Sequence, residues 1–133
     1  MDKNKINISA IETFLNTKFD NVISNNTFVG SKLPDKAAIP SEWKDMCLVN
    51  IPNGVRDQEG FGEGTVLVYL LARPQESGRK NVSALSQMEK KLNEVIANNK
   101  DATYTLSRRL VYTGYNKERD WHFNAIEVII KVF

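Results

Sequence analysis

The sequence predicts an α+β domain, in which a mainly antiparallel four-stranded sheet carries two helices packed on one of its faces. Two segments repeat apolar residues at the helical period, and four have the apolar or alternating composition of strands. The elements follow in the order α-β-β-α-β-β, which is typical of segregated α and β structure. The last two strands are joined by a short polar turn, so we expect an antiparallel hairpin. A chain of 133 residues suits a single domain over residues 1–133.

The first helix is predicted over residues 9–23. Ser9 and Glu12 have the spacing of a capping box. Its apolar residues fall on one face: Ile11, Phe14, Leu15, Phe19, Val22 and Ile23. Such a stripe indicates a side that faces the core rather than a cofactor site.

The second helix is predicted over residues 82–97. Its apolar face consists of Val82, Leu85, Met88, Leu92, Val95 and Ile96. The opposite face carries charged residues and is expected to be solvated. Asn98 and Asn99 are a suitable C-terminal stop.

Four strands complete the expected fold. The first, 46–51, ends at the turn signal Pro52-Asn53-Gly54, and the second covers 65–72. In the third, 103–113, we expect one face to consist of Tyr104, Leu106, Leu110 and Tyr112, with Arg108 as the exception. The last covers 121–133, and its alternation places four residues in the core beneath the helices: Ile126, Val128, Ile130 and Val132.

Three closely spaced glycines, Gly60, Gly62 and Gly64, raise the question of a phosphate-binding loop. Such a loop follows a strand and opens a helix, whereas these glycines lead into the predicted strand TVLVYLLA. We therefore interpret residues 53–64 as a charged loop, mobile in a free subunit and ordered on assembly, with Phe61 as its anchor. A plain solvated loop is the equally weighted alternative.

Composition excludes several classes of protein. The net charge of +2 is too balanced to indicate nucleic-acid binding. Cys47 is the single cysteine, so no internal disulfide forms. The start MDKNKINI lacks the apolar core of a signal peptide, and the most apolar segments are too short to span a bilayer as helices.

No catalytic or metal-binding constellation stands out. A catalytic dyad of His122 and Cys47 is conceivable, but no local signature surrounds either residue. The favoured interpretation is that Cys47 is a small apolar core residue and that His122 flanks a hairpin turn. One histidine and one cysteine do not make a conventional zinc site, and Asp57, Glu59 and Glu63 lack the calcium-loop pattern. We therefore expect no enzymatic activity and no cofactor.

Several local patterns resemble the bacteriophage tail-terminator and tail-completion family of small neck proteins. They include the N-terminal helix SAIETFLNTKF, the two-proline segment KLPDKAAIPSEW before CLVNI, and the strand and helix TVLVYLLA and SALSQMEKKLNEVI. The closing hairpin, RRLVYTGYNKERDWHFNAIEVIIKVF, has a charged turn and a last strand that begins with aromatic residues. The resemblance covers nearly the whole chain. The long charged excursion at 53–64 and the first five residues depart from it.

The resemblance implies a structural role rather than catalysis. Such proteins form rings, typically hexameric, at the head-proximal end of the phage tail, where they stop tube polymerisation and join the tail to the head. The implied partners are further copies of the chain, the tail-tube protein and head–tail connector proteins. The implied location is the virion, after synthesis in the host cytoplasm, with no membrane or direct nucleic-acid contact.

Seven charged or aromatic residues are candidates for the subunit or partner interface: Arg56, Asp57, Glu59, Phe61, Glu63, Arg108 and Arg109. The alternative function is a small partner-binding adaptor or immunity-type module. A ring would favour the terminator, and a monomer or dimer would favour the adaptor.

Overall fold

The computed structural model describes residues 7–133 of the protein. The prediction that the chain starts without a signal peptide rests on residues 1–8, most of which lie outside this range. The described chain forms one sheet and two α-helices, α1 (Ile8–Phe19) and α2 (Val82–Asn98), with a single turn of 3₁₀-helix, η2 (Lys36–Ala38). The strands are β1 (Thr27–Val29), β2 (Asp45–Asn50), β3 (Val55–Gln58), β4 (Phe61–Ala72), β5 (Tyr104–Asn116) and β6 (Trp121–Val132).

The prediction of a four-stranded antiparallel sheet, with elements in the order α-β-β-α-β-β along the chain, is wrong. Within residues 7–133 the sheet has six strands in the order β1-β2-β4-β6-β5, and β3 pairs with β4 alongside that path. It is mixed, because β1 runs parallel to β2 while the other pairs are antiparallel. The α+β class and the two helices remain.

Each helix begins at an asparagine. The Asn7 side chain accepts a hydrogen bond from the Ala10 N–H at 3.1 Å, and Asn81 caps α2 in the same way through Ala84, also at 3.1 Å. The capping box expected at Ser9 and Glu12 is therefore wrong, because α1 starts one residue before Ser9. A side-chain acceptor at this position satisfies an N–H that the helix leaves free.

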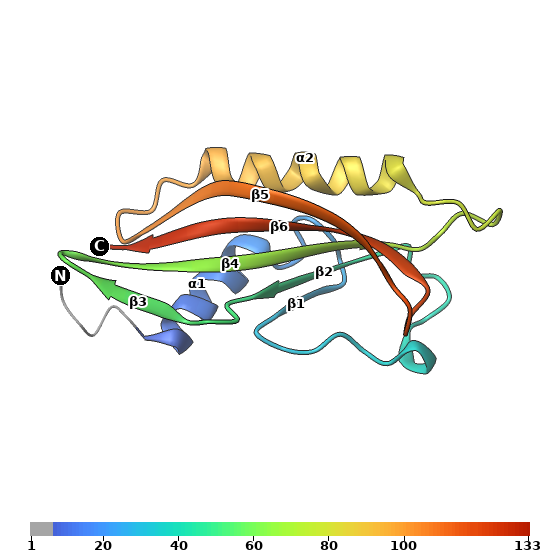
Figure 1. The fold of residues 1–133 in the computed structure, drawn as a ribbon, viewed down its shortest axis with the longest axis horizontal. Helices are drawn as coiled ribbons and strands as arrows, with labels where there is room; N and C mark the ends of the chain where they lie inside the picture. Colours follow the sequence, from blue (N-terminus) through green and yellow to red (C-terminus); the bar gives the residue numbers. More distant parts are fainter. Residues whose placement is uncertain (1–6) are drawn as a thin grey trace.

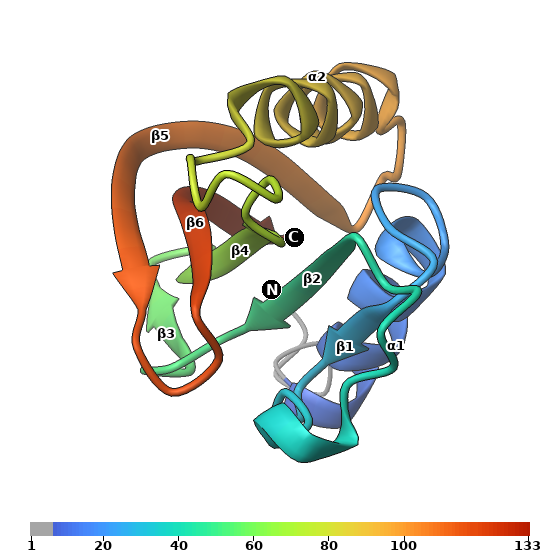
Figure 2. The same cartoon turned by 90° about the vertical axis from the view of Figure 1, so that its right-hand side faces the viewer.

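The two helices pack on the same face of the sheet. In Figure 1, α1 lies behind the strands and α2 runs along the side of β5, and Figure 2 shows both helices on one side of the curved sheet. Their buried residues (Ile11, Phe14, Leu15, Phe19, Leu85, Met88 and Leu92) join one core with the even positions of β4 and β6. The predicted core residues Ile126, Val128, Ile130 and Val132 are all 0% exposed, which confirms the alternation expected for this strand.

The opposite face is partly covered at one end. Met46, Leu71 and Trp121 form a smaller buried cluster there. The segment around η2 covers it, since Leu33, Ile39 and Trp43 pack against it. The rest of this face carries no helix among the described residues, and we call it the open face.

The flexible charged loop expected at 53–64 is a β-hairpin. Residues 55–58 pair with residues 61–64, and Gly60 takes a φ of +88° in the turn between them. Positive φ is the conformation that glycine adopts without steric cost. The Gly54 expected to end β2 also has positive φ, +69°, so that turn prediction is confirmed.

The expected single apolar face of β5 is also wrong. The register shifts between Arg108, which lies opposite Val128, and Val111, which lies opposite Ile126. This bulge moves the strand's alternation by one residue, as an extra residue in one strand must. Tyr104 and Leu106 therefore face the helices, whereas Leu110 and Tyr112 are exposed.

Candidate interaction surface

The structure divides the seven predicted interface residues between different surfaces. The register places Arg56, Phe61 and Glu63 on the open face, because Glu63 lies opposite both Arg56 and Lys131. Asp57 and Glu59 are exposed at the end of the β3–β4 hairpin. The seven candidates therefore lie on more than one surface of the subunit.

Arg108 lies on the helix-covered face. Its guanidinium donates to Asn93 Oδ1 at 2.6 Å and forms an ion pair with Glu89 at 3.0 Å, both on α2. These contacts hold α2 against β5. Arg108 thus has a structural role within the subunit.

Arg109 joins the open-face residues across the sheet. A shallow depression of about 190 Å³ is lined by Arg109, Arg56 and Glu63, with Thr65 and Ile129 between them. The Arg109 Nε lies 3.9 Å from Glu127 Oε2. Charges of both signs therefore alternate around this end of the open face.

Phe61 is anchored within its own subunit. Its ring lies 5.9 Å from the ring of Phe133, centroid to centroid, and Lys131 Nζ lies 5.3 Å from its centre. Lys131 Nζ is also 3.9 Å from Glu63 Oε1. The hairpin is thus held against the end of β6 rather than extended as a free arm.

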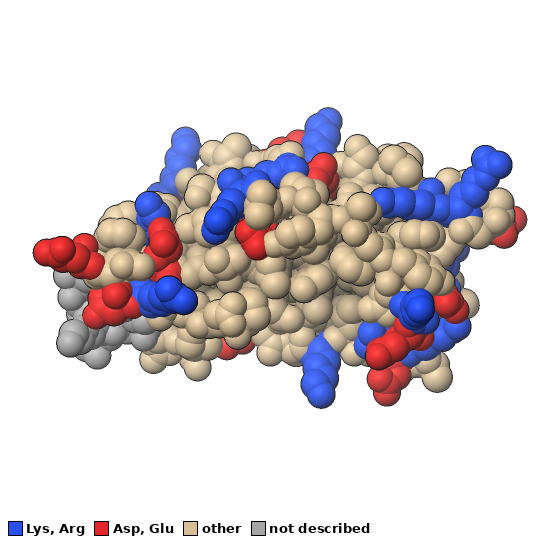
Figure 3. Space-filling model, in the orientation of Figure 1, with Lys and Arg blue, Asp and Glu red and all other residues tan. Residues whose placement is uncertain are grey.

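The middle of the open face is apolar and half-buried. Its side chains come from the odd positions of β4 and β6 and from β2: Leu48, Leu67, Tyr69, Phe123 and Ile129. In Figure 3, most residues in the middle of this face are uncharged, with a few charged side chains among them and more toward the two ends of the molecule. Glu127 is a charged side chain of this middle part: it lies opposite Leu67 and accepts a hydrogen bond from the Tyr112 hydroxyl. A largely apolar centre with a charged rim is typical of a protein-binding surface.

A groove of about 560 Å³ opens at one end of this face. Its floor is formed by Leu48, Tyr69, Leu71 and Phe123. Its walls come from two segments far apart in sequence: Ser31, Lys32, Leu33 and Asp35 on one side, and Asn116, Glu118 and Arg119 on the other. Tyr69 and Phe123 meet edge to face at 5.7 Å between centroids.

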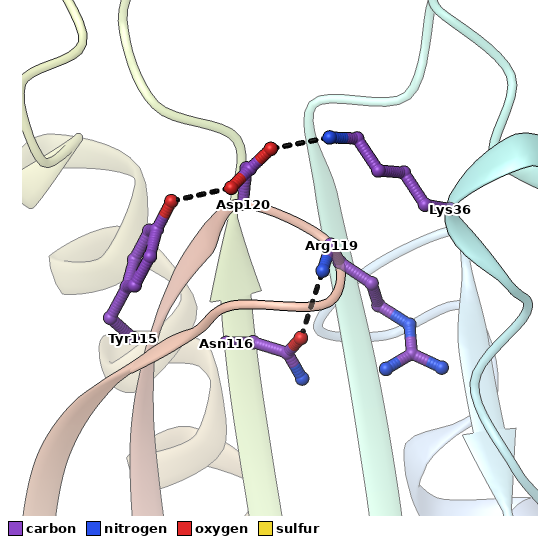
Figure 4. Close-up of polar contacts among 5 residues, drawn as sticks. All are labelled: Lys36, Tyr115, Asn116, Arg119 and Asp120. Atoms are coloured by element: carbon purple, nitrogen blue, oxygen red, sulfur yellow. Dashed lines mark hydrogen bonds and ion pairs between the residues drawn. The ribbon is translucent and has the colours of Figure 1, made fainter.

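The two walls are tied together by the β5–β6 turn. The Arg119 guanidinium donates from Nε to the Pro34 carbonyl at 2.8 Å and from Nη2 to the Leu33 carbonyl at 3.3 Å. Asp120 pairs with Lys36 and accepts a hydrogen bond from the Tyr115 hydroxyl at 2.7 Å (Figure 4). Lys36 and then Tyr115 hold the pKa of Asp120 below its ordinary value, because both stabilise the carboxylate.

His122 and Cys47 do not form a dyad. Cys47 is on β2 and His122 on β6, with β4 between them. Burial raises the pKa of the Cys47 thiol to about 12, so it stays protonated at neutral pH. This confirms Cys47 as a core residue. The His122 ring lies 5.0 Å from Tyr115, centroid to centroid.

Within the described range, no group of three or more His, Cys, Asp or Glu side chains is placed to hold a metal ion. Neither helix of the described chain is long and apolar enough to cross a membrane. No protein-family model and no curated protein matches the sequence.

Sequence reasoning missed the groove. The odd positions of β4 and β6 indicate a second, partly apolar face, because they include Leu67, Tyr69 and Ile129. Arg119 had no such signal, since its partners are backbone carbonyls about 85 residues away in the chain.

Proposed function

We propose that this protein is a structural subunit of the phage tail-terminator or tail-completion kind, forming a ring at the head-proximal end of the tail. The observation that carries the proposal is the open face of the sheet. Two helices cover the other face, yet half-buried Leu67, Tyr69 and Ile129 stay accessible here. Apolar side chains gathered on one surface are suited to contact with another protein.

The proposal also rests on the resemblance of local sequence patterns described above. In such a ring the subunits bind head to tail, so that two different surfaces of each copy meet. The open face would contact the tail tube or a neighbouring copy, and the ring would stop the addition of further tube protein. The connector on the head side would bind the exposed surface of the ring.

The test is a tube-capping assay. Tail-tube protein is polymerised with and without this protein, and tube length and the mass of the added protein on the tube end are measured by electron microscopy and light scattering. Wild type should cap tubes as a ring of several copies. A protein that stays monomeric and leaves tube growth unchanged would overturn the proposal and favour the adaptor alternative.

A variant at the centre of the open face sharpens the test. Leu67→Lys places an ammonium group opposite Glu127, so the sheet gains a favourable cross-strand pair while the apolar surface is lost. Capping should fall at least about tenfold in half-effective concentration, equivalent to about 1.4 kcal/mol. Ser86→Lys, on the exposed side of α2, is the matched control and should cap normally. Equal capping by Leu67→Lys would show that this face is not the contact.

A further inference from the structure

The outer edge of β5 is a second exposed surface, distinct from the open face. β5 is the last strand in the sheet order, so within residues 7–133 one of its sides pairs with no other strand. Thirteen residues form this edge, Tyr104–Asn116. Edge strands present free N–H and C=O groups that another strand can pair with.

Exposed apolar side chains concentrate on this edge. Eight large hydrophobic residues are exposed in the described part of the chain, and four lie within six positions of β5: Leu110, Val111, Tyr112 and Tyr115. Val111 and Tyr112 point to opposite faces of the strand, because Val111 lies opposite core residue Ile126 and Tyr112 opposite Ala125. Both faces of this half of β5 are therefore accessible, as strand addition requires.

The edge carries little of the usual protection against pairing. The bulge between Arg108 and Val111 includes Leu110, the first residue of the apolar stretch, whereas residues 111–115 pair regularly with β6. Residues 110–115 contain no charged side chain and no proline. Charges and prolines are the common means by which natural edge strands avoid association. The regular part of the stretch, residues 111–115, is thus open for pairing over five consecutive residues.

We propose that residues 110–115 of β5 pair antiparallel with the same residues of a second copy of this chain, joining two sheets across a two-fold axis. A strand that meets itself across such an axis runs antiparallel, and it presents apolar residues to apolar residues. Leu110 and Val111 of one copy then lie beside the 114–115 end of the other. The four exposed side chains are covered in each copy.

The charges that flank the stretch support the same partner. Arg109 precedes it, with a side chain that is 61% exposed, and Glu118 follows it, with one that is 86% exposed. Antiparallel pairing brings Arg109 of one copy toward the end of the stretch that carries Glu118 in the other, twice in each dimer, although Lys117 also lies at that end and Glu118 is 3.5 Å from Arg119 of its own chain. A second copy therefore matches this edge in hydrophobicity, and Arg109 and Glu118 are the exposed charges that can pair across the axis. This contact uses the sheet edge and is expected in the free protein, whereas the ring proposed above forms through head-to-tail contacts at the tube end. The tube-capping assay, and not the dimer, therefore decides between the terminator and the adaptor.

The first test measures mass and amide exchange of the wild-type chain over a range of concentrations. We expect a species of twice the 15.1 kDa chain mass in sedimentation equilibrium. Hydrogen–deuterium exchange in residues 110–115 should slow as concentration rises. A chain that remains 15.1 kDa throughout, or exchange in this segment that is independent of concentration, would overturn the proposal.

Variants locate the contact. Val111→Lys adds a charge to the edge and should weaken the dimer at least about tenfold, whereas Val82→Lys, the same change at the exposed start of α2, should not. Arg109→Glu and Glu118→Arg should each weaken the dimer, and the double variant should regain most of the affinity. Thermal melting checks that each variant is folded. A folded Val111→Lys protein that dimerises like wild type, or a double variant no tighter than the singles, contradicts this edge.

Discussion

A single carboxylate fixes the start of β5. Asp101 Oδ1 accepts hydrogen bonds from the backbone N–H of Thr103 at 2.8 Å and of Tyr104 at 2.9 Å. The Tyr104 N–H, followed by that of Thr103, lowers the pKa of Asp101, because both bonds favour the charged form. These two hydrogen bonds fix the backbone at the end of the connection between α2 and β5.

Removing this carboxylate should destabilise the protein in a pH-dependent way. Asp101→Ala should lower the free energy of unfolding by about 1 kcal/mol at neutral pH, the usual cost of losing such a side-chain acceptor. Because the folded-state pKa lies below the unfolded value near 3.8, this contribution is present above that value and is lost as pH falls through the folded pKa. Urea unfolding of both proteins at about pH 7 and about pH 3 measures it.

Asp101→Asn is the control for this prediction, since it keeps an oxygen acceptor without the charge. It should retain part of the stability and show less pH dependence than wild type. If the difference between wild type and Asp101→Ala were as large in acid as at neutral pH, the ionised carboxylate would not be the source of the stability.

Among the elements, β6 separates the two faces of the sheet most clearly. Val128 is 0% exposed in the helix-covered core, and its neighbour Ile129 is half-buried on the open face. Both lie between β4 and β5, so they share one backbone environment. Only the direction of the side chain differs between them.

This alternation predicts opposite outcomes for one substitution. Val128→Asp should lower the free energy of unfolding by about 4 kcal/mol or more, because a carboxyl group is buried without a partner. Ile129→Asp, which places the same group on the open face near Arg109, should cost about 1 kcal/mol. Circular dichroism and thermal melting distinguish them. A folded Val128→Asp protein that melts with wild type would show that the even positions do not form the core.

The two helices, β2 and the β5–β6 hairpin could be predicted from the sequence because each has a strong period or a clear turn. β1 and β3 could not. β1 has three residues, too few for any period, and it joins the sheet in parallel through contacts distant in sequence. β3 is Val-Arg-Asp-Gln, and three of its four side chains are exposed, so backbone pairing rather than apolar alternation defines it.

The candidate surface was harder to predict than the elements. The apolar residues of the open face follow from strand alternation, but the division of the seven predicted residues between faces depends on registers that the sequence does not contain. The bulge near Arg108 is the clearest case. Arg108, before the bulge, lies on the same face as Tyr104 and Leu106, as the sequence predicted, and contacts α2. Beyond the bulge Tyr112 is turned to the open face, which reverses its sequence-based assignment.

At the scale of the whole molecule, the β5–β6 turn is joined to the segment around η2. Arg119 donates to the Leu33 and Pro34 carbonyls, and Asp120 pairs with Lys36. Figure 4 shows the Lys36–Asp120 pair between the turn and that segment. The segment in turn covers the cluster of Met46, Leu71 and Trp121. The turn therefore holds the cover of the smaller core and shapes the groove beside it.

Arg119 should accordingly contribute more to stability than other charged residues of its turn. Its side chain is 12% exposed, and truncation leaves two carbonyls of the covering segment without their donor. Arg119→Ala should lower the free energy of unfolding by about 2–3 kcal/mol. Arg119→Lys should recover only part of this loss, because one ammonium group cannot reproduce the planar fork that reaches both carbonyls.

Lys117→Ala, at an exposed position of the same turn, is the matched control and should change stability by less than about 0.5 kcal/mol. Urea unfolding followed by the fluorescence of Trp43 and Trp121 reports on the cover and on the cluster beneath it. If Arg119→Ala unfolded at the wild-type midpoint with an unchanged slope, the turn would not be holding this segment in place.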